Sequence, residues 1–170
     1  MADLPVPITL DALTTEKGLR EALLALNNLH EVELSWLEAD RLTRMVDEAF
    51  IALRIGVVEA FLLVFDQDAD YDSPNFLWFR TRYPRFAYVD RVVVAEHARG
   101  RGHARRLYDL LFDRARAAGH EWVVCEVNSD PPNPGSDAFH ARLGFVEVGA
   151  AEIHGGKKTV RYLAKALGAV

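Results

Sequence analysis

A stretch of small and basic residues follows an apolar run and opens an amphipathic segment: Arg99-Gly100-Arg101-Gly102-His103-Ala104. Small residues at Gly100, Gly102 and Ala104 would let a phosphate group approach the backbone closely. The first amides of a helix have no intrahelical partner, and the helix dipole adds positive potential at the same end. The spacing therefore predicts a site where backbone amides and arginines hold a polyphosphate.

Two better-known phosphate motifs do not match this loop. A Walker loop ends in Gly-Lys followed by Ser or Thr, which the loop lacks. A Rossmann fingerprint needs a third glycine near Arg105 and an acidic residue at the end of the next strand, where the chain has Asn128. A plain glycine turn with solvated arginines is the simpler alternative, but the flanking strand and amphipathic helix favour the phosphate site.

The charge of the chain limits the partners of this loop. The 170 residues carry a formal net charge of −5, whereas general nucleic-acid binding needs a basic surface that displaces counterions. We therefore expect no nucleic-acid partner. The apolar runs are strand-sized, far below the ~20 residues of a membrane span, and the first residues lack a signal-peptide pattern. These features predict a cytoplasmic protein with no membrane partner.

Neither a metal site nor a disulfide is expected. Aspartates alternate at positions 66, 68, 70 and 72 as in calcium loops, but the required glycine and closing glutamate are missing. Cys125 is the lone cysteine and lies in the apolar run 122–127, so we interpret it as a core residue.

The hydrophobic pattern predicts a single α/β domain over residues 1–170, with a central mixed sheet of about six to seven strands flanked by about four helices. Helices are expected at 16–26, capped by Thr14 or Thr15, and at 38–49, 104–118 and 136–143. A short helix should begin at Ser73-Pro74. Strands are expected at 50–55, 59–65, 86–95, 122–127, 145–152 and 159–164. The basic loop thus joins a strand to the longest helix.

With these elements in place, the sequence resembles the GNAT superfamily of N-acetyltransferases. The hallmark of that family, Arg/Gln-x-x-Gly-x-Gly/Ala at a helix start, is matched by Arg99, Gly102 and Ala104. A second block, from Asn128 to the Leu-Gly-Phe turn at 143–145, is also similar. The resemblance covers residues 88–145 well and the first half only in element order. It implies a sheet whose central strands splay apart to admit acetyl-CoA.

The same resemblance divides the domain and assigns the residues that bind acetyl-CoA. Acceptor-side elements occupy about 1–85, the acetyl-CoA-binding core about 86–145, and closing strands 145–165. Strand backbone should bind the pantetheine arm, loop amides the pyrophosphate, and two asparagines the thioester end, although turn chemistry alone also explains those asparagines. The implied set is Val92, Val93, Val94, Arg99, Gly100, Arg101, Gly102, His103, Ala104, Arg105, Asn128 and Asn133.

The resemblance implies direct attack of an amine on the thioester, with no acyl-enzyme. Many relatives place a tyrosine after the aromatic residue matching Phe139, as the acid for the leaving thiolate. This chain has His140 there, which we predict as the donor, with Tyr108 and Tyr162 as alternatives. A helix-surface histidine without a role is the simpler interpretation of His140.

Three carboxylates are candidates for the base. Asp90 ranks first because alternation along a strand puts it on the face of Val92 and Val94. Glu59, at the start of another central strand, ranks second, and Glu126 third. A chain of water molecules to bulk solvent could replace all three.

The acceptor is expected to be a primary amine of a small molecule or a peptide. Asn28 and Glu31 lie at a polar helix end in the region where relatives bind the acceptor, and Tyr71 lies in an acidic, aromatic segment that would favour a cation. A solvated loop is the alternative for that segment. The alternative function is a non-catalytic acyl-CoA sensor with the same fold, and a homodimer is possible in either case.

Overall fold

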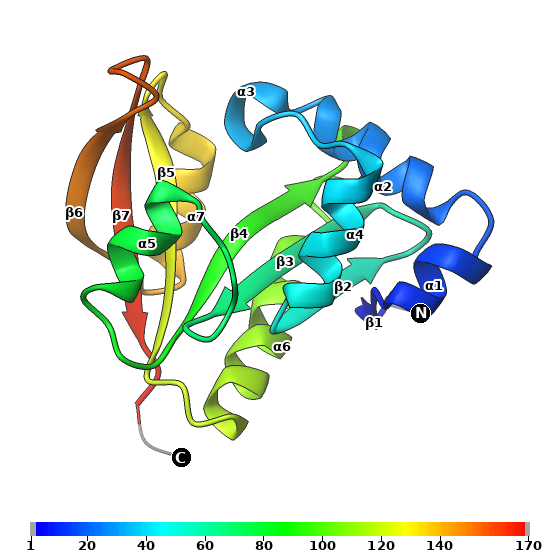
Figure 1. Ribbon diagram of the computed structural model, residues 1–170, viewed down its shortest axis with the longest axis horizontal. Helices are drawn as coiled ribbons and strands as arrows, with labels where there is room; N and C mark the ends of the chain where they lie inside the picture. The colour runs from blue at the N-terminus through cyan, green and yellow to red at the C-terminus, as the bar shows by residue number, and fades with distance from the viewer. Residues whose placement is uncertain (1–2, 169–170) are drawn as a thin grey trace.

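The computed structural model describes residues 3–168, which form one mixed sheet of seven strands with helices on both faces (Figure 1). The strands follow the order β1-β2-β3-β4-β5-β7-β6, and only β4 and β5 pair in parallel. The mixed α/β sheet predicted from the sequence is therefore confirmed, with β1 as an edge strand that the pattern did not indicate. The strands are β1 (Val6–Pro7), β2 (Ile51–Ile55), β3 (Ala60–Asp66), β4 (Phe86–Val94), β5 (Trp122–Asp130), β6 (Val146–Ile153) and β7 (Lys158–Ala166).

The helices outnumber the predicted four. Gly18, with φ of 81°, separates α1 from α2, so the single helix expected over 16–26 is wrong at its start. The hydroxyls of Thr14 and Thr15 bond carbonyls one turn back inside α1 instead of capping a helix. The helices are α1 (Leu10–Thr15), α2 (Leu19–Asn28), α3 (Glu31–Leu34), α4 (Ala39–Glu48), α5 (Pro74–Arg80), α6 (His103–Ala117) and α7 (Pro134–Arg142), with a 3₁₀ turn at Glu96–Ala98.

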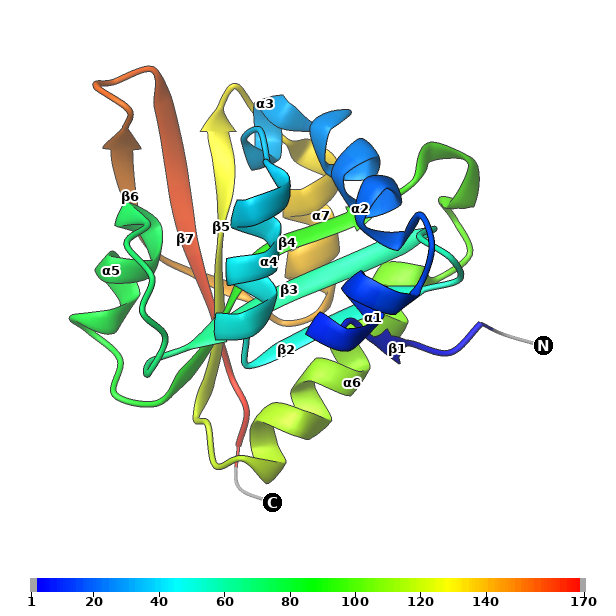
Figure 2. The ribbon, with the colours of Figure 1, turned by 45° about the vertical axis from the view of Figure 1, so that its right-hand side comes forward.

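Two hydrophobic cores lie on opposite faces of the sheet. Helices α1, α2, α4 and α5 cover one face, whereas α6 and α7 cover the other (Figures 1 and 2). Leu107 and Leu111 of α6 are fully buried, and burial of such a side chain contributes about 1.5–3 kcal/mol. No helix within residues 3–168 is both long enough and apolar enough to cross a membrane.

The sheet divides at its centre because β4 and β5 pair only at their beginnings. Phe86 to Tyr88 pair with Trp122 to Val124, and the recorded pairing stops there. Asp90 forms a bulge in β4, since Val89 pairs with Val64 and Arg91 with Leu63. A bulge bends a strand and increases its twist, and beyond it the two strands diverge (Figure 2). The splayed sheet that the family resemblance implied is confirmed.

The insertion between β3 and β4 packs against β6 and β7. Its helix α5 begins after Ser73, as predicted. Trp78 of α5 stacks on Tyr162 of β7 with ring centroids 4.2 Å apart. A Cβ atom at Gly149 of β6 would lie 2.5 Å from the Trp78 ring, so this close approach requires glycine. The insertion is thereby fixed beside the point where β4 and β5 part.

Candidate active site

A cavity of about 610 Å³ opens where β4 and β5 diverge. Its walls come from both strands, from the N-terminal part of α6, from α7 along its length, and from α3. Because β5 does not pair with β4 beyond Tyr88, the β4 edge facing the cavity can bind a ligand through its backbone. Seven residues predicted to bind acetyl-CoA line the cavity: Val92, Val93, Val94, Arg99, Ala104, Asn128 and Asn133.

The basic loop ends the cavity at the start of α6. Gly100 and Gly102 have φ values of 77° and 78°, which side-chain-bearing residues rarely adopt. Gly102 is the N-cap of the fifteen-residue α6. The first amides of this helix have no intrahelical partner and are available to an anion at the loop. Arg99, Arg101 and Arg105 are exposed. This end of the cavity combines amides, dipole and guanidinium groups, which together suit phosphates.

Glu59, predicted as a base, lies behind this loop. Its carboxylate contacts His103 Nε2 at 3.0 Å and Arg101 Nη1 at 3.4 Å. Arg106 donates to His103 Nδ1 at 2.9 Å, so Nδ1 is unprotonated and Nε2–H donates to Glu59. Arg106 also donates to the Arg101 carbonyl. Glu59 and the buried His103 therefore hold the loop in position, and neither lines the cavity.

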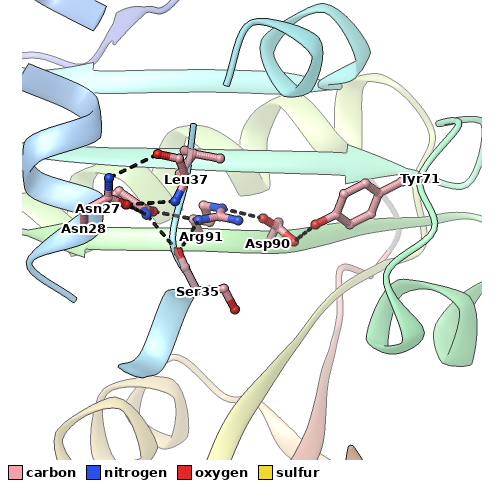
Figure 3. A network of polar contacts seen from close by, with 7 residues as sticks. All are labelled: Asn27, Asn28, Ser35, Leu37, Tyr71, Asp90 and Arg91. Atoms are coloured by element: carbon pink, nitrogen blue, oxygen red, sulfur yellow. Dashed lines mark hydrogen bonds and ion pairs between the residues drawn. The ribbon is translucent and has the colours of Figure 1, made fainter. Parts of the chain in front are cut away.

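Asp90, the first-ranked base, borders the cavity but is already bonded on both oxygens. Tyr71 donates to Oδ1 at 2.6 Å and Arg91 Nε donates to Oδ2 at 2.9 Å (Figure 3). The expectation that Asp90 and Val92 share one face by simple alternation is wrong, because the bulge at Asp90 interrupts the alternation. Val92 packs against the core under α6, whereas Asp90 bonds Tyr71, which packs on the opposite core.

Glu126 of β5 also lines the cavity, and its carboxyl group has a raised pKa. Burial and the nearby charge of Asp90 raise its pKa to about 8, and the neighbouring Tyr88 and Asn75 only partly counter the rise. Its Oε2 atom is buried and has no hydrogen-bond partner of ordinary geometry among residues 3–168. In the sequence, the signal was a single charged residue inside the apolar run 122–127.

His140 forms a buried pair with Tyr108 at the cavity wall. Its Nδ1 lies 2.8 Å from the Ser136 carbonyl, which can only accept, so Nδ1 carries the proton. Nε2 therefore accepts from the Tyr108 hydroxyl at 2.6 Å. Burial lowers the pKa of His140, which favours the neutral ring, and burial raises the pKa of Tyr108. The hydroxyl hydrogen at this position thus belongs to Tyr108 of α6.

The segment that contains α3 forms another wall of the cavity. His30, Glu33 and Leu34 line it, whereas the predicted acceptor residues do not. Asn28 accepts from the Leu37 amide at 2.8 Å and donates to the Leu37 carbonyl at 3.1 Å, Glu31 is exposed, and Tyr71 binds Asp90. A hydrogen bond from Lys158 Nζ to the Val32 carbonyl connects the β6–β7 hairpin to α3.

This geometry agrees with comparison to known proteins. The sequence model of the Acetyltransferase (GNAT) family matches residues 19–145, which is most of the chain. The chain belongs to the GNAT family of acetyltransferases. No protein of curated function matches this GNAT acetyltransferase in sequence.

Solved structures share the fold at low identity. The ribosomal-protein-S18-alanine N-acetyltransferase from Escherichia coli is 14% identical with a TM-score of 0.67, over 99% of this chain and 96% of that chain. The NatC complex bound to Gag peptide and CoA is 12% identical with a TM-score of 0.75, over 99% of this chain and 100% of that chain. The putative acetyltransferase yncA from Salmonella typhimurium, with acetyl-CoA, is 18% identical with a TM-score of 0.68, over 99% of this chain and 95% of that chain. At these identities the likeness establishes the fold alone.

As a GNAT family member, the protein is an acyltransferase, and its residues fit the co-substrate of that family. The unpaired edge of β4 suits the amide-bearing pantetheine arm, and the loop before α6 suits the phosphates. The sequence ranked Glu126 third among the bases and left Tyr108 as an alternative donor, and the structure places both at the cavity. The sequence did not single out Glu33, because a four-residue helix has too weak a pattern to indicate which side chains face a cavity.

Proposed function

We propose that this GNAT acetyltransferase transfers the acetyl group of acetyl-CoA directly to a primary amine of a small molecule or peptide. The observation that carries the proposal is the cavity between β4 and β5, which joins a phosphate-binding loop at one end to Glu126 at the other. A donor bound along β4 would place its thioester between the two strands, close to both Glu126 and Tyr108. The acetyl-CoA complex of yncA, a neighbour in fold, supports this placement.

The donor is held by backbone more than by side chains. Val92 and Val94 offer strand amides and carbonyls, and the amides after Gly102 bind the pyrophosphate. Asn133 caps α7 by accepting from the Ser136 amide at 3.3 Å, which leaves its NH₂ group for the donor. Asn128 lines the cavity at the end where the strands are widest apart. When bound, acetyl-CoA supplies a thioester carbonyl carbon open to nucleophilic attack.

Glu126 acts as the proton acceptor in this proposal. An attacking amine must lose a proton, and a base works best when its pKa lies near the working pH. Glu126 has a pKa of about 8, whereas an ordinary glutamate has 4.5 and would hold the proton weakly. The carboxylate of Glu126 lines the cavity and can receive the proton from the amine directly or through a water molecule.

Tyr108 and His140 assist the leaving thiolate. Tyr108 can turn its hydroxyl from His140 Nε2 to the sulfur, and His140 keeps the hydroxyl at the cavity wall. Burial raises the pKa of Tyr108 above its ordinary value, whereas a thiol has a pKa of ~8.5. Tyr108 therefore donates a hydrogen bond to the thiolate, which takes its proton from water after it leaves.

The acceptor enters beside α3, where Glu33 and His30 meet the cavity. A carboxylate there favours a cationic amine. The neighbours in fold include an enzyme named for acetylating an alanine of ribosomal protein S18 and a complex with Gag peptide, so a peptide amine is a candidate as well as a small amine.

The test is release of free CoA from acetyl-CoA across a panel of small amines and peptide N-termini, with thermal shift as the measure of donor binding. We expect a shift with acetyl-CoA and amine-dependent thiol release. Absence of any thermal shift at millimolar acetyl-CoA would contradict the proposal. A shift without turnover on any amine would favour the acyl-CoA sensor.

A further inference from the structure

A buried polar network connects β4 to the segment 29–38, which includes α3. Arg91 is 5% exposed and lies at the centre of this network (Figure 3). Its Nη1 donates to Asn27 Oδ1 at 2.7 Å and to the Ser35 carbonyl at 3.3 Å, and its Nε donates to Asp90. One guanidinium thus binds the bulge of β4 and the segment that forms the acceptor side.

The segment depends on these contacts for its conformation. Ser35 has φ of 67° and ψ of 148°, a region that residues other than glycine rarely occupy. The carbonyl of Ser35 accepts hydrogen bonds from both Arg91 and Asn27 Nδ2. The side chain of Asn28 donates to the Leu37 carbonyl and accepts from the Leu37 amide. The network therefore holds α3 over the cavity through the same cation that balances Asp90.

Asp90 and Glu126 each lie two residues beyond Tyr88 and Val124, the last pair between β4 and β5, and both line the cavity that opens there. The groups around Glu126 are Tyr88 from β4, Asn75 from α5, Tyr108 from α6, Tyr162 from β7, and Cys125 of its own strand. All of these are neutral groups in their ordinary protonation states. Asp90 is the anion among them, and Arg91 and Tyr71 hold it in place.

We propose that Asp90 is a positioning residue that sets the proton affinity of Glu126 and couples it to the acceptor-side segment through Arg91. The proposal rests on the proposed function, in which Glu126 takes the proton from the acceptor amine. The charge of Asp90 makes a second negative charge at Glu126 unfavourable, so Glu126 holds a proton more tightly than an isolated glutamate. The positive charge of Arg91 partly offsets this repulsion. The hydrogen bonds of Arg91 to Asn27 and Ser35 link its position to that of the segment 29–38.

The deciding variant is Asp90→Asn, which keeps the shape and removes the charge. We expect the acidic limb of the pH profile of kcat/KM to move down by about one pH unit or more, because the repulsion is gone and Arg91 is left unbalanced. Tyr71→Phe is the matched control, since it removes a hydrogen bond to Asp90 without changing any charge, and it should move the limb much less. Arg91→Met should move the acidic limb of the kcat/KM profile to higher pH.

A direct titration keeps the two proposals separate. Carboxyl ¹³C NMR of glutamate-labelled protein, with Glu126 assigned from Glu126→Gln, reports the pKa whether or not an acceptor is known. A downward shift in Asp90→Asn supports the coupling. An unchanged Glu126 titration in a folded Asp90→Asn protein overturns it. Absence of acetyl transfer by the wild type, with the titration shift present, counts against the proposed function alone.

Discussion

The two ends of the cavity are built in different ways. The proposed phosphate end is one continuous stretch, in which Gly100, Gly102 and the start of α6 are neighbours in the sequence. The proposed reaction end draws single residues from several elements: Glu126 from β5, Tyr108 from α6 and His140 from α7. A continuous binding loop can be recognised from its own spacing, whereas a site assembled by tertiary packing cannot.

Replacement of Glu126 has the largest expected effect and tests whether the ends are separable. In Glu126→Gln the proton acceptor is lost, so kcat should fall by about 10²–10⁴-fold, while the Kd of acetyl-CoA stays unchanged. Glu59→Gln is the matched control at the other end, since Glu59 supports the phosphate loop. It should weaken acetyl-CoA binding and leave kcat at saturation close to wild type. A Glu126→Gln enzyme of normal kcat would mean that the proton leaves by another route.

Replacement of Gly102 tests the phosphate end alone. A side chain in its left-handed conformation costs about 1–2 kcal/mol, so Gly102→Ala should raise the Kd of acetyl-CoA by roughly tenfold, measured by calorimetry. Gly155→Ala is the control, since Gly155 has φ of 65° and open space around it but lies in the β6–β7 turn. Equal effects of the two variants on Kd would show that general destabilisation, not the loop, weakens binding.

Tyr108→Phe tests the donor at the reaction end with a smaller expected effect. Loss of one hydrogen bond to the thiolate, at about 0.5–1.5 kcal/mol, predicts a fall in kcat of roughly 3–10-fold. The double variant with His140→Ala should be non-additive, because the two side chains bond each other. Effects on kcat that simply add would show that Tyr108 and His140 act independently.

A separate prediction concerns stability and also isolates Glu126. Its folded-state pKa of about 8 exceeds the ordinary 4.5, so the folded protein binds the proton more tightly than the unfolded chain. Its contribution to stability is fully present below 4.5 and is lost as pH rises through 8. Glu126→Gln should therefore gain in Tm relative to wild type as pH rises between these values, by about 10 °C at pH 8, as measured by circular dichroism at pH 5 to 9. A pH-independent difference would contradict the raised pKa.

Hydrophobic periodicity predicted much of the fold, and the elements that it did not predict share physical causes. Strands such as β3 and β5 are long apolar runs, so their patterns are strong. Helices α1 and α3 are too short for a reliable period, and a strand of two residues such as β1 has none. The bulge at Asp90 depends on how β4 pairs with β3, so alternation along β4 alone placed Asp90 on the wrong face.

The sequence by itself determined the phosphate loop and, through it, the family, because glycines, amides and arginines act there within a few residues of one another. Tertiary structure alone decided the roles of the acidic residues. Glu59, Asp90 and Glu126 are chemically similar in the sequence, but one supports a loop, one is bonded to Arg91 and Tyr71, and one lines the cavity with a raised pKa. Proton affinity depends on burial and neighbouring charge, and both arise only when β4 and β5 diverge in the folded sheet.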